Sequence, residues 1–373
     1  MRAMVFEEFG GSVDVRSVPD PVPSPGGVVV AVHATGLCRS DWHAWAGHDD
    51  GVALPHVPGH ELVGVVVEVG TDVRRWTIGD RVTTPFVCGC GACEWCRGGQ
   101  AQVCPDQTQP GFTHWGSFAE YVALHAADTN LVTVTDLVDD AAAAALGCRF
   151  ATAYRALHAR AGVRRGEWVA VVGVGGVGLS AVQVAVAAGA RVVAVDRTPA
   201  ALDLARSLGA AHTVLAGPGD RSDGGEHGVD VVAQVHDLTG GGSHVSVDAV
   251  GSAGTCADAI HSLRRHGRHV QVGLLPSVGG HPAVPMDRVI AWELDVLGTH
   301  GMASVDYPGM LRLVEAGTLR PQDLVERVVG LADGARLLPA LDTAAPVGVT
   351  LIDPRLPLFE GETNPPQQTL GRQ

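Results

Sequence analysis

Four of the eight cysteines of the chain lie close together in one glycine-rich stretch. They are Cys90, Cys93, Cys96 and Cys104, with spacings of 3, 3 and 8 residues. Four thiolates at such intervals suit a tetrahedral zinc site, which would be structural because no coordination position is left for a substrate. An iron–sulfur cluster takes four thiolates as well, and the spacing alone does not exclude it. Cys88 offers an alternative ligand that would shift the set by one position.

The remaining cysteines, Cys38, Cys148 and Cys256, lie far apart in the sequence. Residues 1–10 contain no apolar run of the kind found in signal peptides, so we expect no disulfide framework. Taken alone, Cys38, Cys148 and His60 are each typical of a buried thiol or a buried histidine, and spacing does not join them into a site.

A glycine pattern at residues 173–178 could bind a dinucleotide. It follows one apolar stretch and opens another, and it consists of Gly173, Val174, Gly175, Gly176, Val177 and Gly178. Such glycines allow a tight turn, close approach of a pyrophosphate and close packing of helix on strand, and the helix N-terminus faces the phosphates. A glycine-rich turn in any α/β protein is the plainer alternative. The strand, turn, helix and second strand together favour dinucleotide binding.

Asp196 ends the next predicted strand, 18 residues after Gly178. A carboxylate there accepts hydrogen bonds from the hydroxyls of the adenosine ribose, whereas a 2′-phosphate would meet its negative charge. The sequence therefore favours NAD over NADP, and the neighbouring Arg197 weakens this preference a little.

The predicted secondary structure around these residues differs between the first part of the chain and the rest. The first part contains short strand-like segments, and from about residue 141 an alanine-rich helical stretch leads into alternating strands and helices. We predict strands at 28–33, 62–69, 118–124, 168–172, 191–196, 229–235, 244–249 and 269–273, and helices at 176–188, 199–208 and near 308–316. Alternation of this kind predicts a parallel, doubly wound sheet inserted into a β-rich domain.

These patterns give the domain boundaries. We place the β-rich domain at 1–150 with a metal-binding lobe at 88–105, and the dinucleotide-binding domain at 151–287. The chain then returns to the β-rich domain at 288–353. The tail at 354–373, rich in Pro, Gln and Thr, is expected to be disordered.

Composition and charge exclude several classes of protein. The chain has 373 residues, of which 46% are hydrophobic and 18% charged, so it can bury sizeable cores. A net charge of −14 argues against nucleic acid or an anionic membrane as the main partner. The absence of lysine excludes Schiff-base and P-loop chemistry. Residues 169–190 carry no charge, but five glycines favour a strand, turn and helix over a membrane span. We expect a cytoplasmic protein.

Taken together, these residues resemble the zinc-dependent alcohol dehydrogenases of the medium-chain dehydrogenase/reductase superfamily. The resemblance extends to about residue 353. It is carried by Gly-Leu-Cys-Arg-Ser-Asp-Trp-His at 36–43, Gly-His-Glu at 59–61, the four-cysteine stretch, Gly-Cys at 147–148, and the glycine pattern with Asp196. It implies an α/β fold: a GroES-like β-rich catalytic domain and an inserted Rossmann domain with a doubly wound parallel sheet.

The resemblance also implies roles for individual residues. Cys38, His60 and Cys148 would hold a catalytic zinc and the four-cysteine stretch a structural zinc, giving two zinc ions per chain. Glu61 would lie behind the catalytic metal and exchange with a ligand, and Asp41 would fix the tautomer of His60. Ser40 would take the proton of the alcohol, and His43 would pass it to solvent.

Further residues are implied for the cofactor and the substrate. Arg39 would bind the pyrophosphate, and the nicotinamide pocket would be lined by Val250, Val272, Gly273 and Leu274. Candidates for the wall of the substrate pocket are Trp42, Trp45, Phe86 and Trp115. Trp45 and Trp115 are equally typical of core aromatics. Arg149 departs from the family pattern. It is either a charge that recognises substrate or an outward-facing side chain, and we favour the second. Cys88 is expected to be a passive thiol.

The reaction implied is reversible hydride transfer between NAD and an alcohol, with an aldehyde or ketone as the product. An apolar pocket favours apolar or aromatic substrates. Two alternatives remain open: another zinc-dependent dehydrogenase of the superfamily, acting on a polyol or a secondary metabolite, and a non-catalytic NAD-binding relative. The resemblance further implies a homodimer or homotetramer that pairs through an edge strand of the nucleotide domain.

Overall fold

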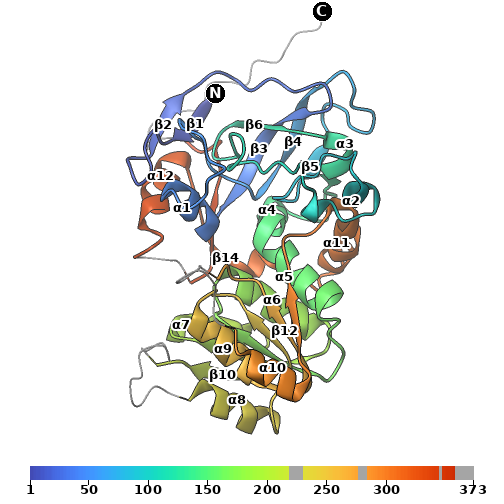
Figure 1. Cartoon of the computed structure of the whole chain (residues 1–373). Helices are drawn as coiled ribbons and strands as arrows, with labels where there is room; N and C mark the ends of the chain where they lie inside the picture. Colours follow the sequence, from blue (N-terminus) through green and yellow to red (C-terminus); the bar gives the residue numbers. More distant parts are fainter. Residues whose placement is uncertain (218–229, 276–283, 344–346, 358–373) are drawn as a thin grey trace, which may run out of the picture.

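The computed structural model of the chain describes residues 1–217, 230–275, 284–343 and 347–357. Figure 1 shows two lobes, the upper one built around β3 and β4 and the lower one carrying α6 to α10. The chain begins in the upper lobe, forms the lower one, and returns to the upper lobe with β14 and α12. This is the predicted arrangement of a β-rich domain with an inserted α/β domain.

The upper lobe is organised by a mixed sheet, seven-stranded within the described residues. Its order is β14-β15-β3-β4-β5-β7, with β6 also paired to β3. Valines of β3 pack with apolar side chains of β4, β5 and β6 to form a buried core. The strands are β3 (Val28–Leu37), β4 (Leu62–Val69), β5 (Arg81–Thr83), β6 (Tyr121–Leu124), β7 (Val132–Thr133), β14 (Val325–Val329) and β15 (Val349–Ile352).

Short elements surround this sheet. A two-stranded sheet pairs β1 (Arg2–Val5) with β2 (Asp14–Ser17). The helices are α1 (Arg39–Trp45), α2 (Glu94–Arg97), α3 (Ala127–Asn130), α11 (Tyr307–Glu315) and α12 (Leu331–Ala340), with 3-10 turns at Ala101–Val103, Ser304–Asp306 and Pro321–Leu324. The predicted helix near 308–316 is therefore confirmed as α11.

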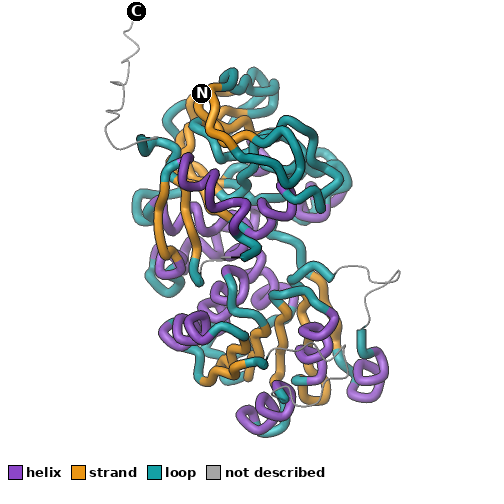
Figure 2. Tube along the Cα trace, turned by 90° about the vertical axis from the view of Figure 1, so that its left-hand side faces the viewer, coloured by secondary structure: helices purple, strands orange, loops and turns teal. Residues whose placement is uncertain are grey.

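The lower lobe contains a parallel sheet, six-stranded in the described part of the chain, in the order β10-β9-β8-β11-β12-β13. The strands are β8 (Trp168–Val172), β9 (Arg191–Asp196), β10 (His212–Leu215), β11 (Ser243–Asp248), β12 (Leu263–Gln271) and β13 (Asp295–Gly298). The order reverses between β8 and β11, and a ligand binds at such a switch point of a doubly wound sheet. Figure 2 shows helices packed around these strands.

The helices of the lower lobe are α6 (Gly176–Ala187), α7 (Pro199–Ser207), α8 (Val231–Thr239), α9 (Ala253–His261) and α10 (Met286–Trp292). The uncharged stretch at 169–190 forms β8, a turn and α6, as predicted. Among the described residues, no helix has the length and apolar character needed to cross a membrane.

Three predictions need correction or fall outside the structure. The predicted strand at 229–235 is wrong, because α8 occupies residues 231–239. The Asp230 side chain caps this helix by accepting from Ala233 N at 3.0 Å, and Val231 and Val235, four residues apart, are both buried on one face. Strand β10 was missed. The parallel sheet includes β13, so it extends beyond the predicted boundary at 287. Residues 358–373 of the predicted tail lie outside the described residues.

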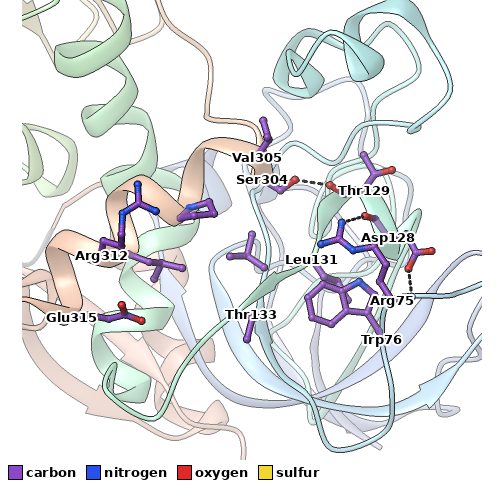
Figure 3. A pocket seen from close by; sticks show the side chains of 13 residues that line it. Arg75, Trp76, Asp128, Thr129, Leu131, Thr133, Ser304, Val305, Arg312 and Glu315 are labelled. Atoms are coloured by element: carbon purple, nitrogen blue, oxygen red, sulfur yellow. Dashed lines mark hydrogen bonds between the residues drawn. The ribbon is translucent and has the colours of Figure 1, made fainter.

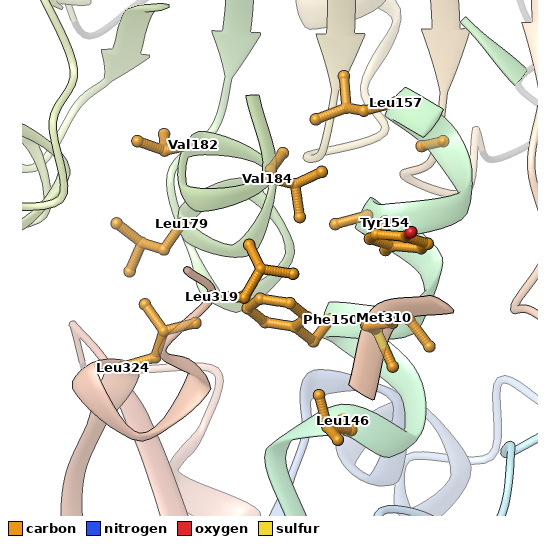
Figure 4. Packing of buried hydrophobic residues seen from close by; sticks show 14 of the residues in the cluster. Leu146, Phe150, Tyr154, Leu157, Leu179, Val182, Val184, Met310, Leu319 and Leu324 are labelled. Atoms are coloured by element: carbon orange, nitrogen blue, oxygen red, sulfur yellow. The ribbon is translucent and has the colours of Figure 1, made fainter. Parts of the chain in front are cut away.

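A helical connection joins the two lobes. It consists of α4 (Asp140–Ala145), a π-helical segment (Leu146–Phe150), α5 (Ala151–Arg155) and a second π-helical segment (Ala156–Arg160). Figure 4 shows Phe150 and Tyr154 of this connection facing α6 on one side and Met310 of α11 on the other. The same buried cluster includes Ala34 of β3 and Val171 of β8, so one core runs through both lobes.

Candidate active site

Three separate segments bring the predicted catalytic ligands together. Cys38 follows β3, His60 precedes β4, and Cys148 lies in the π-helical segment after α4. The ligand atoms of these residues and of Glu61 all lie within 4.8 Å of one another. π-helical turns are rare and often occur at functional sites. The structure thus makes a possible metal site from residues that spacing could not connect.

Asp41 fixes the orientation of His60. Its Oδ1 lies 2.9 Å from His60 Nδ1 and accepts from Gly59 N at 3.1 Å, while its Oδ2 accepts from Cys38 N at 2.8 Å. With Nδ1 donating to Asp41, only Nε2 is free to bind a metal. His60 Nε2 is buried and has no hydrogen-bond partner in the described part of the chain. An unpartnered ring nitrogen beside two thiols fits a metal ion.

The electrostatics of the cluster favour a thiolate at Cys38. The hydrogen bond that Cys148 donates lowers the pKa of the Cys38 thiol well below its usual range, against the effect of burial. Burial opposes charge on His60, yet the Asp41 carboxylate raises the pKa of His60. Two cysteines and one histidine are an established ligand set of catalytic zinc, with alcohol dehydrogenase as the standard case. The residues present therefore fit a zinc ion.

Arg149 corrects both interpretations that the sequence left open. The side chain is only 7% exposed and points inward to Glu61, which is fully buried. Glu61 Oε1 accepts from Arg149 N at 2.9 Å and Nε at 3.1 Å, and Oε2 accepts from Nη2. Arg149 is therefore neither outward-facing nor free to recognise a substrate. Sequence reasoning missed the pair because 88 positions separate its members.

The predicted relay residues lie on α1. Ser40 Oγ is 3.8 Å from Cys38 Sγ, next to the metal site. His43 Nδ1 lies 3.0 Å from Nδ1 of His48, a residue that sequence reasoning did not consider. Burial lowers the pKa of His43, and the charges of Arg39 and His48 lower it further. His43 is therefore neutral near pH 7 and able to accept a proton.

Two phenylalanine rings lie beside the ring of His60. The ring of Phe86 lies 6.0 Å from that of His60 and 5.4 Å from that of His300, and the ring of Phe112 lies 5.2 Å from His60. Phe86 thus lies beside the ligand His60, and its role as a pocket wall stays a prediction. Phe112 and His300 were missed, since nothing in the sequence near either residue marks it as a neighbour of His60.

The tryptophans lie elsewhere. Trp42 packs beside His43 and His48, and its ring carries the Arg39 guanidinium at 4.5 Å. Trp115 packs against the β1 cluster and donates to Pro55 O at 3.0 Å. Trp45 donates to Gly11 O at 2.9 Å and contributes to hydrophobic clusters. These contacts favour the interpretation of Trp45 and Trp115 as packing residues.

The four-cysteine lobe forms the second possible metal site in the described residues. The thiols of Cys90, Cys93, Cys96 and Cys104 all lie within 4.8 Å of one another. Cys88 is excluded from the set. It is buried beside Thr84, with the two side chains 3.4 Å apart, and burial raises the pKa of its thiol to about 11. The expectation of a passive thiol fits this position.

The glycine pattern forms a tight turn between β8 and α6. Gly173 has φ +84°, and a Cβ on Gly178 would lie 1.9 Å from Gly173 O, so a side chain would separate helix from strand. Gly175 caps the N-terminus of α6. Asp196 Oδ2 accepts from Val174 N at 2.8 Å and its Oδ1 accepts from Thr198 N at 2.8 Å. The predicted ribose carboxylate is thus held against the turn.

The remaining cofactor candidates are Val250, Val272, Gly273, Leu274, Arg197 and Arg39. Val250 touches Gly173, because a Cβ there would lie 2.3 Å from Val250 Cγ2, and Gly273 packs against Gly251 in the same way. Val272 N donates to Asp248 O at 3.1 Å, whereas Leu274 and Arg197 are exposed. Arg39 is not free, since it donates to Leu341 O at 2.6 Å and to Asp342 at 2.8 Å.

A cavity of about 580 Å³ lies away from these residues, between α3 and α11. Figure 3 shows Arg312 and Glu315 on one side and Arg75, Trp76 and Asp128 on the other. It contains none of the residues assigned to the metal or dinucleotide sites.

Comparison with known proteins agrees with the geometry. Residues 24–136 match the family described as "Alcohol dehydrogenase GroES-like domain", and residues 176–316 match "Zinc-binding dehydrogenase". An alcohol dehydrogenase from Geobacillus stearothermophilus is 39% identical over 280 residues, covering 74% of this chain and 78% of that protein. The chain belongs to the zinc-dependent alcohol dehydrogenases. This confirms the resemblance and the α/β fold with GroES-like and Rossmann domains.

Solved structures of this family show the same arrangement. A crystal structure of an NAD-dependent alcohol dehydrogenase matches with a TM-score of 0.83 and 32% identity, covering 95% of this chain and 99% of that one. A protein from Sinorhizobium meliloti 1021 with NADP bound matches with a TM-score of 0.81 and 28% identity, with the same coverage. The chain is thus an oxidoreductase of the alcohol dehydrogenase type. The first of these two neighbours is described as NAD-dependent, and the second has NADP bound.

Proposed function

We propose that this alcohol dehydrogenase transfers hydride between an apolar or aromatic alcohol and NAD at the Cys38–His60–Cys148 site. The observation that carries the proposal is the buried, unpartnered Nε2 of His60 beside two thiols. A zinc ion held there acts as a Lewis acid, which lowers the pKa of an alcohol hydroxyl and polarises a carbonyl in the reverse reaction.

The chain's own residues handle the proton. Ser40 lies beside Cys38, where its hydroxyl accepts the alcohol proton and donates its own onward. The lowered pKa of His43 leaves its imidazole unprotonated near neutral pH, so the ring has a free nitrogen that accepts the proton and then releases it towards solvent. Asp41 accepts from Nδ1 of His60 and holds the ring in one tautomer throughout.

The cofactor assignment follows from charge. The Asp196 carboxylate lies at the glycine-rich turn, where it accepts hydrogen bonds from ribose hydroxyls and repels a 2′-phosphate. We therefore propose NAD as the preferred dinucleotide, with its pyrophosphate at the N-terminus of α6. Arg39 would reach the pyrophosphate by leaving Asp342. The ion pair of Arg39 with Asp342 is exposed and contributes little stability.

We further propose two zinc ions per chain and assembly into a homodimer or homotetramer. Support for the second zinc is the cluster of four thiols at Cys90, Cys93, Cys96 and Cys104. Support for assembly is β13, the last strand of the parallel sheet among the described residues, where Val296 is 43% exposed. An unpaired strand edge is a site for pairing with a second chain. Sedimentation velocity tests this, and a monomer would contradict it.

The test of function is NADH formation over a panel of short aliphatic, long aliphatic, benzylic, terpenoid, secondary and polyol alcohols. We expect benzylic and long aliphatic alcohols to rank first, because Phe86 and Phe112 lie beside His60. A zinc chelator should remove the activity, and NADP should support less of it than NAD. Preference for a polyol would overturn the substrate class and leave the reaction class intact.

Substitutions separate the site from the fold. Cys38→Ala or His60→Ala should abolish turnover, since each removes a ligand from the buried cluster. Cys256→Ala is the matched control, because Cys256 is also buried but lies in α9 of the other lobe. Near-normal activity in either ligand variant would show the site assignment to be wrong. No turnover in the wild type, with two zincs and NAD bound, would favour a non-catalytic relative.

A further inference from the structure

The buried pair of Glu61 and Arg149 raises a question about the metal site. Glu61 offers a carboxylate oxygen within 4.8 Å of the ligand atoms of Cys38, His60 and Cys148. Carboxylates bind zinc readily, and a fourth protein ligand would close the site to a substrate. Something must therefore keep Glu61 from the position that a substrate oxygen needs.

Arg149 meets this requirement by occupying both carboxylate oxygens. Oε1 accepts from the backbone N and the side-chain Nε of Arg149, and Oε2 accepts from Nη2. Arg149 Nη1 is itself held by Leu37 O at 3.3 Å, next to the ligand Cys38. A guanidinium that binds a carboxylate through two nitrogens fixes direction as well as charge.

Two glycines make room for the pair. A Cβ on Gly36 would lie 2.2 Å from Glu61 Oε2 and 2.7 Å from Arg149 Nη2. A Cβ on Gly176 would lie 2.5 Å from Arg149 Cδ. Gly176 is the first residue of α6, in the glycine-rich turn of the other lobe. Arg149 thus lies between the metal ligands and the dinucleotide turn, and its position depends on both lobes.

We propose that Arg149 is a positioning residue that holds Glu61 out of the fourth coordination position of the catalytic metal, and that its place against Gly176 maintains this hold. Without Arg149, the buried carboxylate has lost its partner and turns to the nearest cation, the metal. The fourth position then closes. The proposal rests on the metal assignment made above, and the experiment tests that assignment separately.

The experiment uses the full chain with cobalt(II) in place of zinc and imidazole as a probe that binds an open fourth position. Visible absorption of cobalt in the wild type, and its change on adding imidazole, tests the Cys38–His60–Cys148 assignment by itself. In Arg149→Met we expect the affinity for imidazole to fall by at least about tenfold, because Glu61 competes from within the site. The four-thiolate lobe also takes cobalt and is an unchanged internal reference.

A double variant separates positioning from a structural role. Arg149→Met combined with Glu61→Gln should regain wild-type imidazole affinity, since the amide carries no charge and is a poorer ligand. The double variant leaves no unpaired charge behind, so it remains informative if Arg149→Met alone folds poorly. Unchanged imidazole binding in Arg149→Met, or a double variant that stays as weak, would overturn the proposal.

The glycine-rich turn supplies a second test with a matched control. Gly176→Ala should displace Arg149 and weaken imidazole binding in the same direction as Arg149→Met, although residue 176 touches no metal ligand. Gly175→Ala is the control for the cobalt spectrum, because a Cβ there meets nothing within 4 Å. Both measurements are made without NAD. Equal spectra and affinities in the two glycine variants would contradict the role of Gly176.

Discussion

One buried carboxylate, that of Asp41, joins two of the three segments that meet at the metal site. The carboxylate accepts from the backbone N–H groups of Cys38 and Gly59 and from the ring of His60. It therefore fixes two of the metal ligands, Cys38 and His60, and the backbone next to each. Removing one partner of a buried charged group is costly because the other remains desolvated. At the scale of single residues, a few short hydrogen bonds of Asp41 thus hold both the ring of His60 and the backbone around the metal ligands.

The proton relay gives a pH-dependent prediction at this scale. Because the pKa of His43 is lowered, its imidazole stays neutral at pH values below the usual pKa of a histidine. The wild type therefore retains a proton acceptor near neutral pH. We expect His43→Gln to oxidise alcohol at least about tenfold more slowly near pH 7 and to approach the wild-type rate at alkaline pH, where hydroxide accepts the proton. The measurement is kcat against pH.

His266→Gln is the control for this measurement, since His266 is exposed and lies in β12 of the other lobe. Its profile should match that of the wild type. A His43→Gln profile parallel to the wild type at every pH would contradict the relay.

The four-cysteine lobe shows what a metal contributes at the scale of an element. In this lobe the described backbone forms α2, one 3-10 turn and a bridge from Cys88 to Thr108, and the backbone hydrogen bonds within residues 93–104 are those of short turns. Backbone N–H groups of Ala92 and Cys93 lower the pKa of Cys90 to about 7, whereas burial raises the pKa of Cys96 to about 12. Without an ion, the four thiols would not all be deprotonated, and binding of the metal is coupled to folding of such a segment.

We predict that Cys96→Ser loses one zinc per chain and leaves the lobe open to proteolysis, while the catalytic zinc stays. Metal analysis and limited proteolysis measure the two effects. Cys88→Ser is the matched control and should retain two zincs, because Cys88 lies outside the cluster. Loss of zinc from Cys88→Ser instead would show that the ligand set is shifted by one position.

At the scale of the whole molecule, the two lobes are joined by one continuous core. Leu319 lies in it beside Phe150, as Figure 4 shows, and connects the returning chain to the helical connection. Truncating a fully buried leucine removes contacts and leaves a cavity. Truncation of the Leu319 side chain should therefore lower the stability of both lobes.

We expect Leu319→Ala to lower the free energy of unfolding by about 2–5 kcal/mol. Urea unfolding followed by circular dichroism measures this change. Leu137→Ala, at a position 77% exposed, should change it by less than about 0.5 kcal/mol. A change in Leu319→Ala as small as that of the control would show that the lobes do not share this core energetically.

Elements whose signals are local could be predicted from the order of the residues alone. The glycine pattern with Asp196, the four cysteines and most strands of the lower lobe could be predicted, because turns, metal loops and buried strands depend on residues near one another in the chain. The exception at 229–235 shows the limit of such reasoning. A short valine-rich run fits a strand or a helix, and the cap formed by Asp230 with the packing of Val235 decided for α8.

Contacts between residues far apart in the sequence became visible in the folded chain alone. Cys38, His60 and Cys148 could be grouped by resemblance to a family, but their own spacing gave no reason to join them. The ion pair of Glu61 with Arg149, and the contacts of His60 with Phe112 and of Phe86 with His300, had no sequence signal at all. These contacts arise because β3, β4 and the π-helical segment pack around one core, and packing depends on the shape of the whole chain.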